Sequence, residues 1–263
     1  MRLPIVIFTC FLDVVYALQC TSNCSMILSM SEQYQSPTNC SLITANYCSV
    51  KLVFWYEHRN YTVSFFGDDF LEQHNMGESR QFIMIETGRK KFFSYDIYHH
   101  CRETDDCAVE FAKDKIIQMT NRIYNVSKLY YDLGHVLRRR LTLSQNLACF
   151  DMNDAVRQCT VPGMSGSCQI IDDLIKHRFH RRLCLHTIHE SASVNIYDSE
   201  SFAMMTIKCT HMLCNGPITV AAVKKILNKN NLTDIHGRLP GTSVQTQINR
   251  YLFLITICLT FWM

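Results

Sequence analysis

Cysteine placement constrains the fold of this chain more than any other feature of its sequence. The chain has fourteen cysteines, of which Cys10 and Cys258 lie in apolar stretches at its two ends. The others form two groups of six: Cys20, Cys24, Cys40, Cys48, Cys101 and Cys107, then Cys149, Cys159, Cys168, Cys184, Cys209 and Cys214. An even number of cysteines per group, in a chain with secretory signals, is typical of disulfide frameworks. The sequence therefore predicts a small, disulfide-rich, mainly β protein with two modules.

Residues 1–17 have the pattern of a secretory signal peptide. Arg2 supplies a basic start, an apolar run follows, and Val15 and Ala17 place small residues three positions and one position before a cleavage site. We expect cleavage before Leu18, which exports the rest of the chain. A helix buried in the mature fold is the alternative for this segment.

The C-terminal end resembles the signal for a glycolipid anchor. Its last apolar run, residues 251–263, is shorter than the roughly 20 apolar residues of a membrane-spanning helix. Small residues from Gly241 to Ser243 and a polar spacer precede it. We expect the tail to be removed and the lipid to be attached at Gly241 or Ser243. A plain transmembrane tail and a buried C-terminal strand are the alternatives.

Glycosylation patterns and net charge agree with an exported protein. The acceptor pattern Asn-x-Ser/Thr occurs at Asn23, Asn39, Asn60, Asn125 and Asn231. The net charge of +3 is too small to indicate a nucleic-acid partner. The expected location is the outer face of the plasma membrane, or the extracellular space.

The chain divides into segments of different composition. We expect a signal peptide (1–17), a first cysteine-rich module (18–107), a helical segment (108–143), a second cysteine-rich module (147–215), a short helix and linker (216–240), and the anchor signal with its tail (241–263). Within the modules, β-branched and aromatic runs are bounded by turn residues. Both modules are therefore predicted to form short antiparallel hairpins.

The segment between the modules has a helical pattern. It contains no proline over residues 108–138, and apolar residues recur at spacings of three and four: Val109, Ala112, Ile116, Met119, Ile123, Val126, Tyr130, Leu133 and Leu137. This predicts one long amphipathic helix over 108–138. Its apolar face either forms a coiled-coil dimer or packs on the protein's own modules, and the width of the face favours packing. Pro217 opens a shorter helix, predicted over 218–229.

The ends of the second module point to a known family. The module opens with Leu147-Ala-Cys149-Phe and closes with Cys209-x4-Cys214-Asn215. This resembles the Ly-6/urokinase-receptor superfamily of three-finger proteins. The resemblance implies a three-finger module with the bonds Cys149–Cys168, Cys159–Cys184 and Cys209–Cys214.

The first module resembles the same family more loosely. Leu18-Gln19-Cys20 looks like a family start, whereas the closing pair is Cys101-x5-Cys107 without the following asparagine. The resemblance implies the bonds Cys20–Cys48, Cys24–Cys40 and Cys101–Cys107, although six cysteines in principle allow fifteen pairings. Two three-finger-like modules joined by a long helix, with a second short helix after them, are similar to nematode surface proteins. The long helix itself is foreign to the family.

The resemblance implies a non-enzymatic surface protein that binds or modulates another extracellular or membrane protein through its hairpin loops. The basic run from Lys176 to Arg182 would lie on the second finger of module two, where exposed loops carry recognition. The candidate partner-binding residues are Lys176, Arg178, Arg181 and Arg182. A solvated hairpin tip is the plainer interpretation.

The sequence also offers an enzymatic and a soluble alternative to this interpretation. His177, His180, His186 and His189 suggest a zinc site and a secreted metal-dependent hydrolase. Residues three apart on a strand point to opposite faces, however, and the helical H-E-x-x-H order is missing. We therefore expect no catalytic, cofactor-binding or metal-binding residue. A soluble secreted ligand without an anchor is the other alternative.

Overall fold

The computed structural model describes residues 17–35, 38–68, 77–87, 90–138, 147–159, 165–187 and 191–241. Outside the described residues lie residues 1–16 of the predicted signal peptide, together with Ser243 and the apolar C-terminal tail. The described chain is mainly β and disulfide-rich, as the sequence predicts. Its disulfides are Cys20–Cys48, Cys24–Cys40, Cys101–Cys107, Cys149–Cys168, Cys159–Cys184 and Cys209–Cys214. These are the same pairs that the family resemblance implies.

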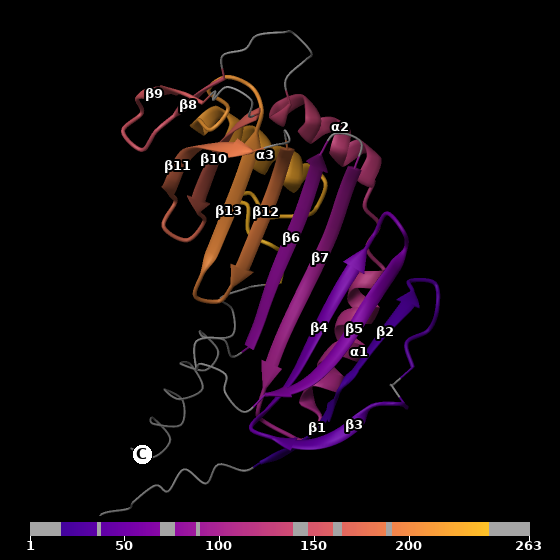
Figure 1. The fold of residues 1–263 in the computed structure, drawn as a ribbon. Coiled ribbons are helices and arrows are strands. Elements are labelled where there is room, and N and C mark those ends of the chain that lie inside the picture. Colours follow the sequence, from indigo (N-terminus) through magenta and orange to yellow (C-terminus); the bar gives the residue numbers. More distant parts are fainter. Residues whose placement is uncertain are drawn as a thin grey trace, which may run out of the picture.

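The strands and helices follow one another in two similar series (Figure 1). The strands are β1 (Leu18–Ser22), β2 (Cys24–Ser29), β3 (Ser41–Ala45), β4 (Tyr47–Trp55), β5 (Asn60–Asp68), β6 (Gly77–Thr87), β7 (Lys90–Cys101), β8 (Ala148–Phe150), β9 (Val156–Gln158), β10 (Ser165–Asp173), β11 (Arg178–Thr187), β12 (Ser191–Ser199) and β13 (Ala203–Cys209). The helices are α1 (Cys107–Thr120), α2 (Val126–Leu137) and α3 (Pro217–Lys229). The last of these lies close to the predicted 218–229.

The first half of the chain, β1–β7, and the second half, β8–β13, repeat one strand order. The first half contains the pair β1-β3 and the series β5-β4-β7-β6, with β2 added beside β5. The second half contains the pair β8-β9 and the series β11-β10-β13-β12. The last strand of each series, β6 in the first half and β12 in the second, therefore lies at the edge that meets the other half.

The two halves are joined through their sheets. Strand β12 pairs antiparallel with β6 from Ser191 opposite Thr87 to Ser199 opposite Ser79. This pairing, called the seam below, produces one nine-stranded sheet with the order β11-β10-β13-β12-β6-β7-β4-β5-β2. The sequence predicts two modules but not their shared sheet.

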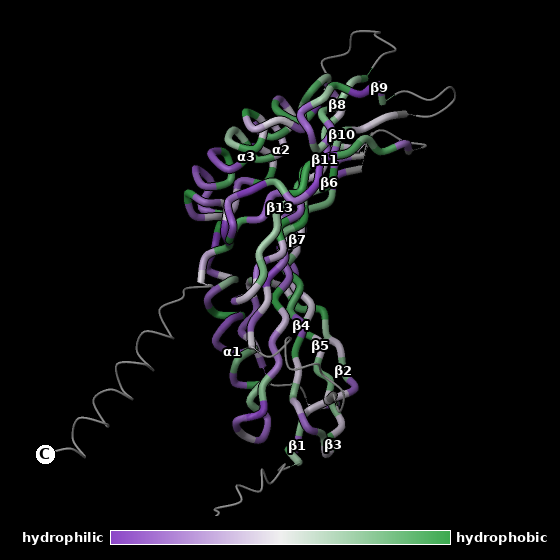
Figure 2. Tube along the Cα trace, turned by 90° about the vertical axis from the view of Figure 1, so that its left-hand side faces the viewer, coloured by the Kyte–Doolittle hydropathy of each residue, from purple (hydrophilic) through white to green (hydrophobic). Residues whose placement is uncertain are grey.

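Within the described residues, helices α1, α2 and α3 lie on one side of the nine-stranded sheet (Figures 1 and 2). Because side chains alternate along a strand, every second residue points toward the helices. These side chains form the core, and examples such as Leu52, Phe54, Phe82, Tyr95 and Ile196 are no more than 1% exposed. We call this side the covered face and the other side the open face.

Ion pairs fasten each helix to the covered face. Lys115 of α1 contacts Glu78 at 3.0 Å, and Lys224 of α3 contacts Asp172 at 2.7 Å. Arg138, at the end of α2, contacts Glu86 at 3.0 Å. The cost of removing these charges from water offsets most of their attraction, so the pairs add little net stability. A helix in another position would leave a charge without its partner, so the pairs fix where each helix lies.

The prediction of one helix over 108–138 is wrong, because the chain forms two helices separated by residues 121–125, called the link below. Asn125 caps the second helix, and its side-chain Oδ1 accepts a hydrogen bond from Lys128 N at 2.9 Å. Such a cap starts a new helix and competes with continuation. Ile123 continues the apolar spacing across the link, yet it is 84% exposed.

The apolar series of these two helices packs within the chain. Ala112, Ile116, Met119, Leu133 and Leu137 are all buried in the core. This is the outcome that the width of the apolar face favours. A coiled-coil dimer would require the same side chains at its interface, and here they are already buried within the chain.

Candidate interaction surface

The open face is one continuous surface that crosses the seam. Residues directly opposite each other on neighbouring strands point to the same side of a sheet. One such row joins Val53, Asp96, Gln81, Tyr197 and Met204, from β4 in the first half to β13 in the second. Both halves therefore contribute to a single surface.

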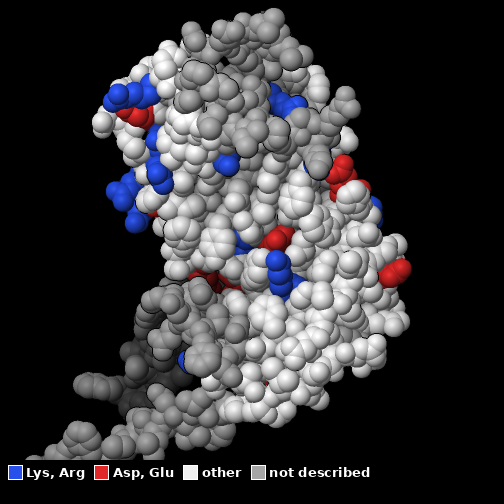
Figure 3. Space-filling view, in the orientation of Figure 1, with Lys and Arg blue, Asp and Glu red and all other residues white. Residues whose placement is uncertain are grey.

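The open face carries apolar and aromatic groups that reach solvent. Ile85 and Phe92, opposite each other on β6 and β7, are 36% and 37% exposed. The Trp55 ring packs edge-on against Phe92, with ring centroids 5.1 Å apart. In the space-filling view of this face, most atoms of the described residues belong to uncharged residues (Figure 3). Exposed apolar and aromatic groups gathered on one surface are typical of protein-binding sites.

Asp96 lies near the middle of the open face with one unpaired oxygen. It is 7% exposed, and its Oδ1 has no hydrogen-bond partner among the described residues. Burial raises the pKa of this carboxyl group, while a hydrogen bond with Ser94 and the charge of Lys51 act in the opposite direction. A buried oxygen without a donor is costly, so a partner that donates a hydrogen bond here would be favoured.

The predicted basic residues lie at the β11 end of the sheet. Lys176, Arg178 and Arg181 are exposed at or beside the β10–β11 turn. Asp173 Oδ1 holds the turn by accepting hydrogen bonds from the backbone N of Ile175 and Lys176, at 3.1 and 2.9 Å. Arg181 is opposite Ile171, so it continues the open face to its outer edge.

The fourth basic candidate, Arg182, is not on the exposed surface. It is 8% exposed, forms an ion pair with Asp154, and stacks its guanidinium over the Phe179 ring at 4.3 Å. Its neighbour Arg181 occupies the open face, and the alternation along the strand turns Arg182 to the other side. Partner contact by Arg182 stays a prediction, and its burial does not favour it. Arg182 instead ties β11 to the loop between β8 and β9.

The histidines of the zinc alternative, where they are described, lie in separate contacts. His177 packs beside His236, with ring centroids 5.4 Å apart, and His186 Nε2 lies 3.7 Å from Cys184 Sγ. His180 is exposed, and His189 lies outside the described residues. Among described residues, the groups with the spacing of metal ligands are Cys149, Cys159 and Cys184, and Cys101, Glu103 and Cys107. The sulfur atoms of these groups are already bonded in disulfides.

The glycosylation candidates all have access to solvent. Asn23, Asn39, Asn125 and Asn231 are exposed. Asn60 is half-buried and lies opposite Trp55 on the open face. A glycan on Asn60 would therefore border this surface.

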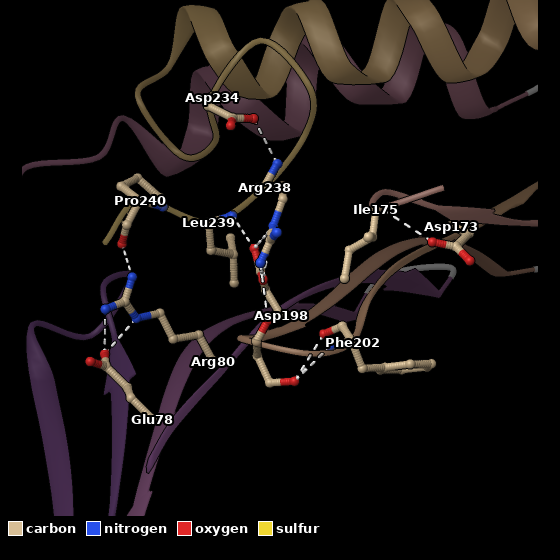
Figure 4. A network of polar contacts seen from close by, with 11 residues as sticks. Glu78, Arg80, Asp173, Ile175, Asp198, Phe202, Asp234, Arg238, Leu239 and Pro240 are labelled. Carbon is tan, nitrogen blue, oxygen red and sulfur yellow. Dashed lines mark hydrogen bonds and ion pairs between the residues drawn. The ribbon is translucent and has the colours of Figure 1, made fainter. Parts of the chain in front are cut away.

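A C-terminal segment, residues 231–241, crosses the seam on the covered face and is called the strap below. Asp198 of β12 accepts hydrogen bonds from Arg238 Nη2 at 2.6 Å and Leu239 N at 2.8 Å. Arg80 of β6, directly opposite Asp198, donates to the Pro240 carbonyl oxygen (Figure 4). The strap is thus tied to both halves.

The strap ends at Gly241, one of the two lipid-attachment candidates. Gly241 is exposed with a φ of 98°, and an added Cβ would lie 2.5 Å from Arg80 Nη1. Only glycine fits this approach to the guanidinium group without displacement. The other candidate, Ser243, lies outside the described residues.

Sequence reasoning missed the strap contacts and the open face. Asp198 and Arg238 are ordinary charged residues far apart in the chain, and no local pattern joins them. The open face had a signal in Trp55 and Phe92. Trp55 and Phe92 give β4 and β7 apolar residues on both sides of the sheet, although the described helices cover only one of these sides.

No protein-family model matches this sequence, and no curated protein matches it. None of the helices within the described residues has the length and apolar character needed to cross a membrane. The function must therefore be inferred from the residues and geometry of the chain itself.

Proposed function

We propose that this chain is a non-enzymatic glycoprotein on the outer face of the plasma membrane, attached by a glycolipid anchor, where it binds or modulates another protein. The export signals, the paired cysteines and the glycosylation patterns support the location. The binding surface is the open face, with the basic β10–β11 hairpin at its edge.

We also propose that each half is a divergent three-finger module. The repeated strand order and the agreement of the disulfides with the family pattern support this assignment. In this arrangement the hairpins of the two modules lie side by side, and their broad faces, as well as their tips, are available for recognition.

The observation that carries the binding proposal is the continuity of the open face across the seam. A sheet covered by helices on one side keeps exposed apolar groups, such as Ile85 and Phe92, on the other. Exposed apolar area of this kind carries a cost in a monomer that burial against a partner removes.

The anchor is tested by treating intact expressing cells with a phosphatidylinositol-specific phospholipase. The proposal expects release of the protein into the medium. Full retention, with a known anchored protein released in the same sample, would reject the anchor. Protein found in the medium before treatment would favour the soluble alternative.

The binding surface is tested by placing a charge on it. Ile85→Glu puts a carboxylate on the open face, and Ile117→Glu puts one on the outer side of α1, where the isoleucine is 52% exposed. Surface proximity labelling should lose its main labelled partner with Ile85→Glu and keep it with Ile117→Glu. Equal labelling by both variants would place binding elsewhere.

A further inference from the structure

A cavity lies between the link and the strap. Its volume is about 500 Å³, within the range of about 300–1,000 Å³ that small-molecule sites occupy. The link contributes Arg122, Ile123 and Tyr124, and the strap contributes Asn231, Thr233 and Asp234. One wall of this cavity is therefore a predicted glycosylation site.

We propose that this cavity is a carbohydrate-binding site, and that its occupant is the first N-acetylglucosamine of a glycan attached to Asn231 itself. The inference rests on the proposed function in one respect, namely that the chain is glycosylated at Asn231. It adds that this glycan is a packed part of the fold.

The end of α3 holds Asn231 rigidly at the cavity wall. Asn231 has a φ of 56°, its N donates to Asn228 O at 2.9 Å, and Leu232 N donates to Leu227 O at 3.0 Å. These are the two hydrogen bonds of a Schellman helix end, with asparagine at the left-handed position. Leu227 and Leu232 are fully buried beneath it. The backbone at the glycosylation site, Asn231, therefore has a fixed position before any sugar is attached.

The lining matches the mixed character of a sugar ring. Ile123 is 84% exposed, and the Tyr124 ring, supported edge-on by Tyr56 at 4.6 Å, is half-buried. These groups can cover the apolar side of the ring. Arg122 and Asp234 supply charged groups for its hydroxyls. Apolar walls with a few polar groups are the usual make-up of a small-molecule site.

One buried polar atom at the cavity lacks a partner. Thr233 is 4% exposed, and its Oγ1 has no hydrogen bond among the described residues. A buried hydroxyl without a partner destabilises a fold. Sugar hydroxyl, amide and ring-oxygen atoms can provide that partner.

A sugar in this cavity would brace the strap against the link. The strap holds the two halves through Asp198 and Arg80, and the link joins α1 to α2. Filling the space between them would slow local opening of both segments.

A helix-ending role alone would also explain asparagine at position 231, so the variants must separate the two roles. Asn231→Gly removes the glycan and keeps the left-handed conformation, which glycine adopts freely. Thr233→Val removes the glycosylation pattern by an isosteric change and deletes the unpaired hydroxyl. Without a bound sugar, both changes should be neutral or stabilising.

The test uses the full-length protein made in cells that attach N-glycans, with occupancy of Asn231 measured by mass spectrometry. We expect both variants to lose occupancy, to lower Tm by about 2–4 °C, and to exchange amide hydrogen faster over residues 121–125 and 231–241. Wild-type protein trimmed to its first N-acetylglucosamine should behave like untrimmed protein.

Ser127→Ala is the matched control, because it removes the glycosylation pattern of Asn125 and leaves the side chain that caps α2. It should change neither exchange over residues 231–241 nor Tm. If Asn231 is occupied and the two variants still match the wild type, the cavity site is overturned while the glycoprotein proposal stands. If Asn231 is unoccupied, this inference and glycosylation at Asn231 are both rejected.

Discussion

The two faces of the nine-stranded sheet differ in what their side chains do. The covered face holds large buried side chains and ion pairs that fasten three helices and the strap. The open face holds partly exposed groups such as Phe92, and one carboxylate oxygen of Asp96 has no hydrogen-bond partner among the described residues. The covered face therefore carries most of the packing that holds the fold together, and the open face is the surface proposed for recognition.

The sharpest contrast between the faces lies in two adjacent phenylalanines. Phe93 is 2% exposed and packs against Phe82 with ring centroids 5.3 Å apart, whereas Phe92 points to the open face. Phe93→Ala should lower the free energy of unfolding by about 3–5 kcal/mol. Phe92→Ala should lower it by about 1 kcal/mol, since it loses mainly the contact with Trp55. Denaturant titration of the released protein measures both, and equal losses would remove the distinction between the faces.

The strap contact with Asp198 should give the next largest effect. The Asp198 side chain is 0% exposed, and Asp198→Ala leaves Arg238 without its ion pair. We expect a loss of about 3 kcal/mol in the free energy of unfolding. Glu200→Gln, an exposed acid after β12, is the control and should stay within about 0.5 kcal/mol of the wild type. If the strap does not hold the two halves together, Asp198→Ala and Glu200→Gln should have the same free energy of unfolding.

His99 gives the covered face a characteristic response to acid. It stacks on Phe111 of α1 with ring centroids 3.8 Å apart, and burial lowers its pKa to about 4 from 6.5. Folding therefore favours the neutral ring, and the stability that it contributes is lost as the pH falls from 6.5 toward 4. His99→Phe keeps the stacking and should unfold with a weaker dependence on pH in this range. An unchanged dependence would show that His99 is not the group responsible.

Asp96 on the open face should respond in the opposite direction. Burial raises its pKa above the ordinary value of 3.8, so folding favours the protonated form. Stability is then lost as the pH rises from 3.8 through the folded pKa. Asp96→Asn should be more stable than the wild type at pH 7 and similar to it below pH 3.8. A variant that is less stable at pH 7 would indicate that Asp96 has a donor and is not kept for a partner.

The basic hairpin should have the smallest effect on stability. Replacing Lys176, Arg178 and Arg181 together by alanine should change the free energy of unfolding by no more than about 0.5 kcal/mol, because all three are exposed. The control replaces Lys113, Lys225 and Lys229, which are exposed on the helices. Slower partner association with the first set alone would assign the hairpin a steering role.

Local patterns predict local features of this chain well. Cysteine spacing, through the family resemblance, implies the same six pairs that the structure contains. Apolar runs between turn residues predict the mainly β fold, and Pro217 marks the start of α3. The helix break was missed because Ile123 preserves the apolar spacing, although the cap at Asn125 was a visible signal.

Features that depend on distant contacts could not be predicted. The seam pairs β6 with β12, strands that lie in different halves, and each alone has the pattern of an ordinary strand. Arg182 has the same charge as Arg181, and only the alternation of side chains along β11 makes Arg182 buried and Arg181 exposed. The candidate surface exists only because the seam places both halves in one sheet.

The central claim is that the open face, and not the covered face or the hairpin alone, meets the partner. Covalent footprinting of the anchored protein on living cells tests it directly, with and without partner-bearing cells. We expect Trp55, Phe92 and Tyr197 to become protected, and residues on the outer sides of the helices, such as Tyr131, to remain unprotected. Protection confined to Lys176, Arg178 and Arg181, with the open-face aromatic residues labelled equally in both samples, would contradict it.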